Sequence, residues 1–243
     1  ALSDDASPER AIILGSLGNG LHDRYLHTSH LGDLDAAITS WEAALRLTQD
    51  DSAHHAKFLN NLANGLHTRY THSGLVADLD RAIVVWEEAV AATAANPPLQ
   101  ASYLNNLADG LFSRYQRTEQ GEDLDTAIQA WNDAIARTPS TSLALAGYLH
   151  NLANGLRACF ARHGQAQDLE AALQAHREAV RRAPEESPDY ALYLNSLGNG
   201  LHDRFLLTGQ VGDLDEAIRA SQYAVDHTVP SSPLRPGYLS SLA

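Results

Sequence analysis

The chain has 243 residues, of which 17 are basic and 30 are acidic, so its net charge is −13. This charge disfavours binding to nucleic acid or to an anionic membrane surface, and it favours a neutral or basic protein partner. The sequence contains no apolar run of about 18 residues, so we expect no transmembrane helix. Its single cysteine, Cys159, allows no intrachain disulfide, which suits a cytoplasmic protein.

The sequence repeats with a period of 45 residues and without any insertion. Equivalent positions hold Leu17, Leu62, Leu107, Leu152, Leu197 and Leu242. A fixed period of this size is typical of stacked supersecondary units, each too small to bury its own apolar face. We predict one array with repeats at 7–51, 52–96, 97–141, 142–186 and 187–231, followed by a partial sixth helix at 232–243. Because the last repeat is incomplete, we expect the chain to be a piece of a longer protein.

Each repeat begins with signals for a long helix. Ser52 is a candidate N-cap, as are its counterparts Ser7, Ser142 and Ser187, and a proline follows the equivalent position in four of the six repeats. An apolar stripe at helical spacing comes next: Leu59, Leu62, Ala63, Leu66 and Tyr70. The helix is predicted to end near residues 71–72, before a left-handed cap that Gly74, Gly164 and Gly209 provide in three of the repeats.

A second helix is predicted from the segment Asp78-Leu79-Asp80 to about Thr93. Asp78 is a candidate N-cap, and Asp80 places negative charge at the positive end of the helix dipole. The predicted apolar stripe of this helix is Leu79, Ala82, Ile83, Trp86, Ala89 and Val90. Since no strand pattern occurs in the sequence, we predict an array of helical hairpins.

These motifs resemble the tetratricopeptide repeat, whose pattern contains an L-G pair, then A-x₃-F and a closing Pro. The L-G pair occurs as Leu17-Gly18 and Leu197-Gly198. The second helices match at both alanine positions and, in three repeats, at the aromatic position: Ala37, Ala82, Ala127, Ala172 and Ala217; Ala44, Ala89, Ala134, Ala179 and Ala224; Trp41, Trp86 and Trp131. The family's repeat has about 34 residues, so this one is longer, mainly in its first helix.

The resemblance implies an all-α fold, a right-handed α-solenoid (superhelix), and a non-enzymatic scaffold that binds protein or peptide without a cofactor. Long repeats of this kind are similar to arrays that flank caspase-like peptidase or NTPase domains in larger proteins.

Asparagine recurs in the first helices although it is a poor helix former. Its amide offers both a donor and an acceptor and can pair with a peptide backbone, as it does at matching sites in the family. We therefore predict that a concave groove binds an extended peptide through Asn19, Asn60, Asn61, Asn64, Asn105, Asn106, Asp109, Asn151, Asn154, Asn195 and Asn199, with His150 taking one equivalent position. The alternative is that these amides bond within or between neighbouring helices.

Two other functions remain open. The end of the array near Leu239 and Leu242 lacks a partner repeat, which predicts possible self-association through the open ends. A regulatory sensor for an enzyme domain elsewhere in a longer protein is the third hypothesis.

Two further regularities favour structural roles. Arginine recurs before an aromatic residue at Arg24, Arg69, Arg114 and Arg204, and we predict that it pairs with the following Asp-Leu-Asp segment to fix the hairpin. A basic stripe at the groove edge is the alternative. Cys159 replaces this arginine in the fourth repeat, where Arg157 or Arg162 is expected to compensate. Glycine at Gly20 and its equivalents lies inside a helix and predicts the close approach of a neighbouring helix.

The sequence predicts neither a metal site nor a catalytic site. The 12 histidines lack the paired ligand spacing of a zinc site. Cys159 has no evident base to activate it.

Overall fold

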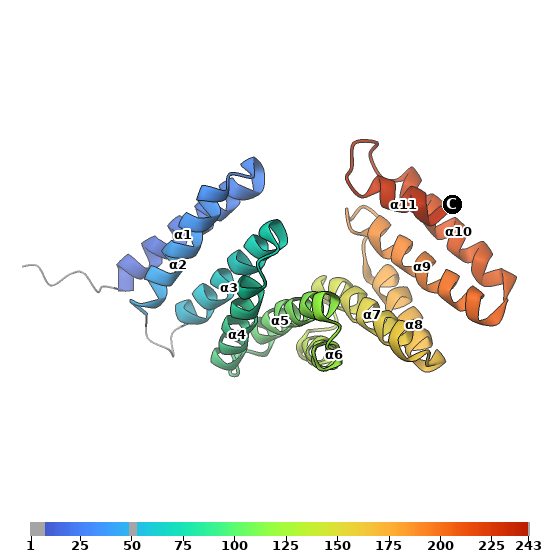
Figure 1. Ribbon diagram of the computed structural model, residues 1–243, viewed down its shortest axis with the longest axis horizontal. Coiled ribbons are helices and arrows are strands. Elements are labelled where there is room, and N and C mark those ends of the chain that lie inside the picture. Colours follow the sequence, from blue (N-terminus) through green and yellow to red (C-terminus); the bar gives the residue numbers. More distant parts are fainter. Residues whose placement is uncertain (1–7, 49–52, 243) are drawn as a thin grey trace, which may run out of the picture. The chain divides into compact units, whose positions relative to one another are not determined.

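The computed structural model describes residues 8–48 and 53–242, and this part of the chain consists of helices and their connections, without a strand (Figure 1). The first helices of the repeats are α1 (Pro8–Thr28), α3 (Ala53–Ser73), α5 (Pro97–Thr118), α7 (Ala144–His163), α9 (Tyr190–Thr208) and α11 (Arg235–Leu242). The second helices are α2 (Leu31–Leu45), α4 (Val76–Ala92), α6 (Gly121–Arg137), α8 (Ala166–Arg182) and α10 (Val211–Asp226). The prediction of an all-α fold of helical hairpins is confirmed.

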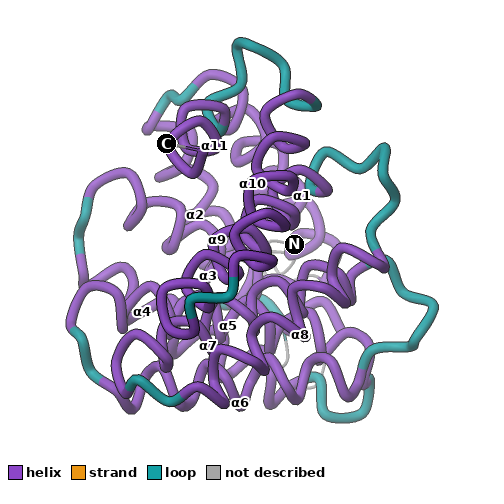
Figure 2. Tube along the Cα trace, turned by 90° about the vertical axis from the view of Figure 1, so that its right-hand side faces the viewer, coloured by secondary structure: helices purple, strands orange, loops and turns teal. Residues whose placement is uncertain are grey.

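The chain forms two compact units, residues 1–126 and 127–243, and the division falls within α6. In the first unit α1 packs on α2, α2 on α3, α3 on α4 and α4 on α5. In the second unit α7, α8, α9, α10 and α11 pack on one another in the same consecutive way. Short connections join the two helices of a hairpin, and longer loops join successive hairpins, as before α9 and α11 (Figure 2). First helices of neighbouring repeats also meet, as α1 with α3 and α7 with α9. Within each unit this is the hairpin stacking of an α-solenoid.

The periodic apolar residues form the core. Trp41 and Trp86 are each only 2% exposed, and Leu62 is 3% exposed. Leu17, the counterpart of Leu62 in the first repeat, is instead 51% exposed, because no described helix lies on that side of α1. Burial of the leucine stripe therefore depends on stacking between repeats and not on the single hairpin.

The tryptophan of three second helices explains the glycine inside the next first helix. A Cβ atom on Gly65 would lie 2.7 Å from Trp41 Cζ3, and one on Gly110 would lie 2.5 Å from Trp86 Cζ3. Gly20 in the first repeat has nothing within 4 Å. The predicted close approach is confirmed for the later repeats. The approaching group is the indole ring of the preceding repeat at Gly65, Gly110 and Gly155, and the side chain of Leu173 at Gly200.

The predicted left-handed caps are confirmed. Gly74, Gly164 and Gly209 have φ angles of 72°, 69° and 71°. In each case the glycine amide donates to a carbonyl four residues back, as from Gly74 to Tyr70 at 2.7 Å. Ser29 (φ 56°) and Glu119 (φ 58°) adopt the same conformation in the first and third repeats.

The predicted helix starts are less accurate. Ser7 and Ser52 lie outside the described residues. Asn96 caps α5, because its Oδ1 accepts from the amide of Leu99 at 3.3 Å. Ser142 is not an N-cap: its hydroxyl accepts from the amide of Ala144 at 3.3 Å, a short turn that precedes α7. Ser187 forms the same turn before α9, with the amide of Asp189. These serines shape the loop before the helix, and α7 and α9 begin one or two residues later than predicted.

Asp78 is likewise not an N-cap, since α4 begins two residues earlier at Val76. Its carboxylate instead accepts from Arg69 Nε at 2.8 Å and Arg69 Nη2 at 2.7 Å, which ties α3 to α4. The same two-bond clamp joins Arg24 to Asp33, Arg114 to Asp123 and Arg204 to Asp213. The predicted arginine–aspartate pair is confirmed. The hydrogen bond from Arg204 lowers the pKa of Asp213 below its usual value.

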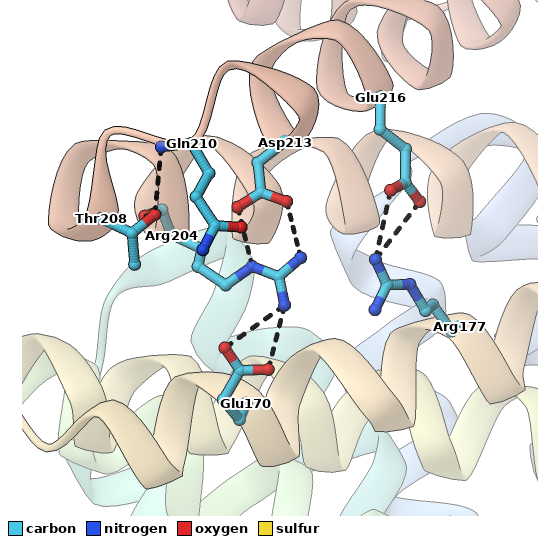
Figure 3. Close-up of polar contacts among 7 residues, drawn as sticks. All are labelled: Glu170, Arg177, Arg204, Thr208, Gln210, Asp213 and Glu216. Atoms are coloured by element: carbon cyan, nitrogen blue, oxygen red, sulfur yellow. Dashed lines mark hydrogen bonds and ion pairs between the residues drawn. The ribbon is translucent and has the colours of Figure 1, made fainter.

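These arginines also join neighbouring repeats. Arg204 Nη1 lies 3.0 Å from Glu170 Oε2 on α8, beside its bonds to Asp213 (Figure 3). Arg69 reaches Asp35 at 2.8 Å, and Arg114 reaches Asp80 at 3.1 Å. Arg69, Arg114 and Arg204 therefore each close their own hairpin and hold the preceding one with the same guanidinium group.

The fourth repeat lacks this clamp. Cys159 is buried at the arginine position. Arg157 bonds Asp203 on α9 through Nε at 2.9 Å and Nη2 at 2.7 Å. The expectation that Arg157 or Arg162 compensates is therefore wrong for Arg157, which links α7 to the next repeat, and among the described residues Arg162 makes no ion pair that would replace the clamp.

Candidate functional site

The asparagine-bearing faces of α1 and α3 enclose a polar recess of about 270 Å³. Its lining consists of Asn19, His22, Asp23, Trp41, Asn61 and Asn64. Three of these residues belong to the asparagine set that the sequence predicts. The recess is small and polar, which suits one or two peptide groups rather than a drug-sized apolar molecule.

Two indole rings fix the orientation of the asparagine amides. Trp41 Nε1 donates to Asn19 Oδ1 at 3.0 Å, and Trp86 Nε1 donates to Asn64 Oδ1 at 3.1 Å. An indole N–H can only donate, so the amide oxygen must face the ring. This contact gives Asn19 and Asn64 a structural role inside the helix.

Asparagine side chains of neighbouring first helices also bond one another. Asn61 Nδ2 donates to Asn19 Oδ1 at 2.9 Å, and Asn106 Nδ2 donates to Asn60 Oδ1 at 2.9 Å. Among the described residues, the Nδ2 groups of Asn19 and Asn64 and the Oδ1 groups of Asn61 and Asn106 make no hydrogen bond. The face therefore presents both amide donors and amide acceptors.

The asparagine face of the second unit differs in its partners. Asn154 Nδ2 lies 3.0 Å from His150 Nε2, and Asn195 Oδ1 is buried without a hydrogen-bond partner in the described chain. Asn199 lines a cavity of about 620 Å³ between α9, α10 and α11, together with His202. In the fourth repeat the position of the tryptophan is taken by His176, whose side chain is fully buried.

The remaining predicted residues lie on the same faces. Asn105 Nδ2 donates to Asp109 Oδ2 at 3.2 Å on α5, and Asn105 is 9% exposed. Asn151 is half-buried on α7. Thus the bonds seen for most of these side chains run to other residues of the array.

His22 and Asp23 line the recess although the sequence did not predict a role for them there. The repeat could have indicated a role for His22, since His67 and His202 occupy the equivalent position in two other repeats. The His22 ring centroid lies 5.7 Å from that of Trp41, and the His67 centroid lies 5.5 Å from that of Trp86. Burial lowers the pKa of both histidines, so both are neutral near pH 7. The described residues hold no group of three or more His, Cys, Asp or Glu side chains placed to bind a metal.

None of the described helices combines the length and the apolar character needed to cross a membrane.

Solved structures of similar architecture are tetratricopeptide-type repeat proteins. MamA has a TM-score of 0.61 at 16% identity, and the match covers 93% of this chain and 100% of MamA. TTC0263, a tetratricopeptide protein of Thermus thermophilus, has a TM-score of 0.59 at 21% identity, covering 96% and 98%. YrrB, described as a tetratricopeptide protein with an unusual peptide-binding site, has a TM-score of 0.55 at 16% identity, covering 95% and 92%. These likenesses establish the fold.

No protein-family model matches the chain, and no curated protein matches it either.

Proposed function

We propose that this protein is a non-enzymatic scaffold that binds an extended protein segment along the asparagine-bearing face of its first helices. The observation that carries the proposal is the polar recess between α1 and α3, where amide donors of Asn19 and Asn64 stand beside the amide oxygen of Asn61. A peptide unit offers one N–H and one C=O, so such a surface can pair with a backbone whatever its side chains. The similar fold of YrrB, a peptide-binding protein by its description, supports the proposal.

The charge of the chain defines the expected ligand. Asp23 lines the recess, and the net charge of the chain is −13. A neutral or basic segment gains from this field, whereas an acidic segment is repelled.

The repeats supply suitable variants for a test. Ser16 and Ser196 occupy the position of Asn61 and Asn106, so serine is compatible with the fold there. We expect the double variant Asn61→Ser/Asn106→Ser to bind a selected peptide about tenfold more weakly, because it loses two amide contacts of about 1 kcal/mol or less each. Peptides are selected by phage display on the wild-type protein, and affinities are measured by fluorescence anisotropy.

Glu88→Ala is the matched control, since Glu88 is an exposed residue of α4 and Ala43 is its counterpart in the first repeat. Its affinity should equal that of the wild type. Peptides that bind all three proteins equally would contradict a groove on this face, and a selection dominated by acidic peptides would contradict the charge argument.

Self-association is a second candidate function, favoured by the two ends of the array. Within the described chain Arg24 bonds only Asp33 and its side chain is 61% exposed, whereas Arg69, Arg114 and Arg204 each also hold a carboxylate of the preceding repeat. Asp215, the counterpart of Asp35 and Asp80, is exposed and has no ion-pair partner in the described part of the chain. The two ends thus carry complementary halves of the contact that joins the repeats.

Sedimentation velocity over a concentration series tests this candidate. If the ends associate head to tail, the wild type forms dimers or longer species at micromolar concentration, and Arg24→Glu shifts it towards monomer. The double variant Arg24→Glu/Asp215→Arg should recover part of the association. A wild type that stays monomeric at all concentrations rejects this function and leaves the peptide scaffold untouched.

A further inference from the structure

A third pocket lies away from the asparagine face, where the loops before and after the fifth hairpin meet α9 and α10. Its volume is about 390 Å³. The residues that matter here are the aromatic side chains of Tyr190, Tyr223, His227 and Tyr238 and the carboxylates of Glu185 and Glu186. A cavity of this size fits a small group rather than a folded partner.

Tyr190, Tyr223 and His227 form one packed cluster. Tyr190 and Tyr223 meet edge to face, with ring centroids 5.6 Å apart and an interplanar angle of 71°. His227 stacks on Tyr223 at 3.7 Å and 9°. Its Nδ1 lies 2.9 Å from the Tyr223 carbonyl oxygen, which fixes the ring against the tyrosine. The cluster therefore holds a fixed arrangement of ring faces and edges.

The repeat itself does not require Tyr190, Tyr223 or His227, whereas Tyr238 continues an aromatic position that holds Phe58, Tyr103, Tyr148 and Tyr193 in other repeats. The position of Tyr223 holds Ala43, Glu88, Asp133 and Glu178 in the other repeats. The position of His227 holds Leu47, Ala92, Arg137 and Arg182, and that of Tyr190 holds Arg10, His55, Gln100 and Leu145. Four equivalent hairpins thus form without the cluster, so a role in folding does not explain it.

The surroundings are acidic. Glu185 and Glu186 are exposed beside the cavity, and Glu185 contributes to the raised pKa of Tyr190, after burial of the phenol. Arg235 on α11 is the nearby cation, but its Nη1 is held by the carbonyl oxygens of Val225 and Thr228. Tyr238 is 3% exposed, lines the cavity, and its hydroxyl has no hydrogen-bond partner within the described residues.

Aromatic faces attract cations through the ring quadrupole, most strongly where water is partly excluded. Carboxylates at the entrance add a longer-range attraction. Taken together, we propose that this pocket of the fifth repeat binds an organic cation, an alkylammonium or guanidinium group, against Tyr190 and Tyr223 with Glu185 and Glu186 as counter-charges. The site is separate from the asparagine face and adds a second binding function to the scaffold.

Titration calorimetry and two-dimensional NMR of the full chain test the site with two probes. N-acetyl-arginine amide presents a guanidinium group, and tetramethylammonium presents an alkylammonium group. The uncharged controls are N-acetyl-citrulline amide and tert-butanol, which have similar shapes. We expect saturable binding of at least one cation with shifts at Tyr190 and Tyr223, and no saturable binding of either control. The preferred cation identifies whether the natural source is an arginine side chain or an alkylated amine.

Tyr223→Ala places the first-repeat residue at this position, so the fold is expected to persist, as circular dichroism will verify. Cation affinity should fall by about threefold to thirtyfold, the range expected for loss of a cation–π contact. Glu185→Gln/Glu186→Gln should weaken binding and reduce its dependence on salt. Asn61→Ser/Asn106→Ser should leave it unchanged, which separates this site from the peptide groove. Equal binding of cations and their uncharged controls, no binding of either cation, or full affinity in a folded Tyr223→Ala variant would overturn the proposal.

Discussion

Trp86→Ala is expected to lower the free energy of unfolding by about 3–5 kcal/mol, the usual range for removing a large aromatic side chain from a core. Trp86 is 2% exposed and fills the space above Gly110 in the next repeat. Alanine leaves a cavity at the contact between two repeats and removes the indole N–H that Asn64 accepts. Equilibrium urea unfolding followed by circular dichroism measures the change.

Trp86→Phe separates the two contributions. It keeps an aromatic ring next to Gly110 but removes the hydrogen bond to Asn64, whose oxygen also faces Asn106 Nδ2 at 3.5 Å. We expect a loss of about 1–2 kcal/mol, mainly from the smaller ring and from the lost indole hydrogen bond, since the Asn64 oxygen keeps only its longer contact to Asn106. If Trp86→Ala costs no more than Trp86→Phe, the indole does not support the stacking of the repeats.

Acidification from pH 7 to pH 5 is expected to destabilise the second unit through two buried histidines. Burial lowers the pKa of His150 to about 4 and that of His176 to about 3. Asp189 opposes the shift at His150, whereas Arg157 and His150 add to the shift at His176. The two rings lie 5.6 Å apart, and neither nitrogen of His176 has a hydrogen-bond partner among the described residues.

The sign of the change in stability follows from where the two histidines bind protons. In the unfolded chain a histidine takes up a proton as the pH falls below about 6.5, whereas these two stay neutral in the folded protein until about pH 4 and pH 3. The stability that neutral burial contributes is present above pH 6.5 and is lost as the pH falls. At pH 5 the expected loss is about 2 kcal/mol for each histidine, measured as the change in unfolding free energy in urea.

The repeats again provide the control. Asn occupies the position of His150 in three other repeats, and Trp occupies the position of His176 in three. His150→Asn/His176→Trp should remove most of this pH dependence, leaving a smaller part from His22 and His67, whose pKa burial also lowers. An unchanged slope between pH 7 and pH 5 in this variant would show that the pair does not control acid stability.

The Asp-Leu-Asp segment is a motif for which the sequence predicted two roles, a helix cap and a partner for arginine, of which the structure confirms only the second. Its recurrence correctly marked the second helix, yet Asp78 lies in the first turn of α4 and holds Arg69 on α3. Aspartate is the residue expected at this position both for a helix cap and for an ion pair with an arginine on the other helix. Only the facing side chain decides between them.

The sequence by itself determined the helical hairpins, the stacking period and the left-handed caps at Gly74, Gly164 and Gly209, because these depend on backbone preferences and on apolar spacing within about 45 residues. The tertiary structure decided what the mid-helix residues do. Asn64 bonds an indole 22 positions away, and Gly110 makes room for the same ring. Such partners are set by how one hairpin packs on the next. The pocket of the fifth repeat is likewise lined by Glu185, Tyr190 and Tyr223, which come from a loop and two different helices. No periodicity in the sequence places those side chains side by side.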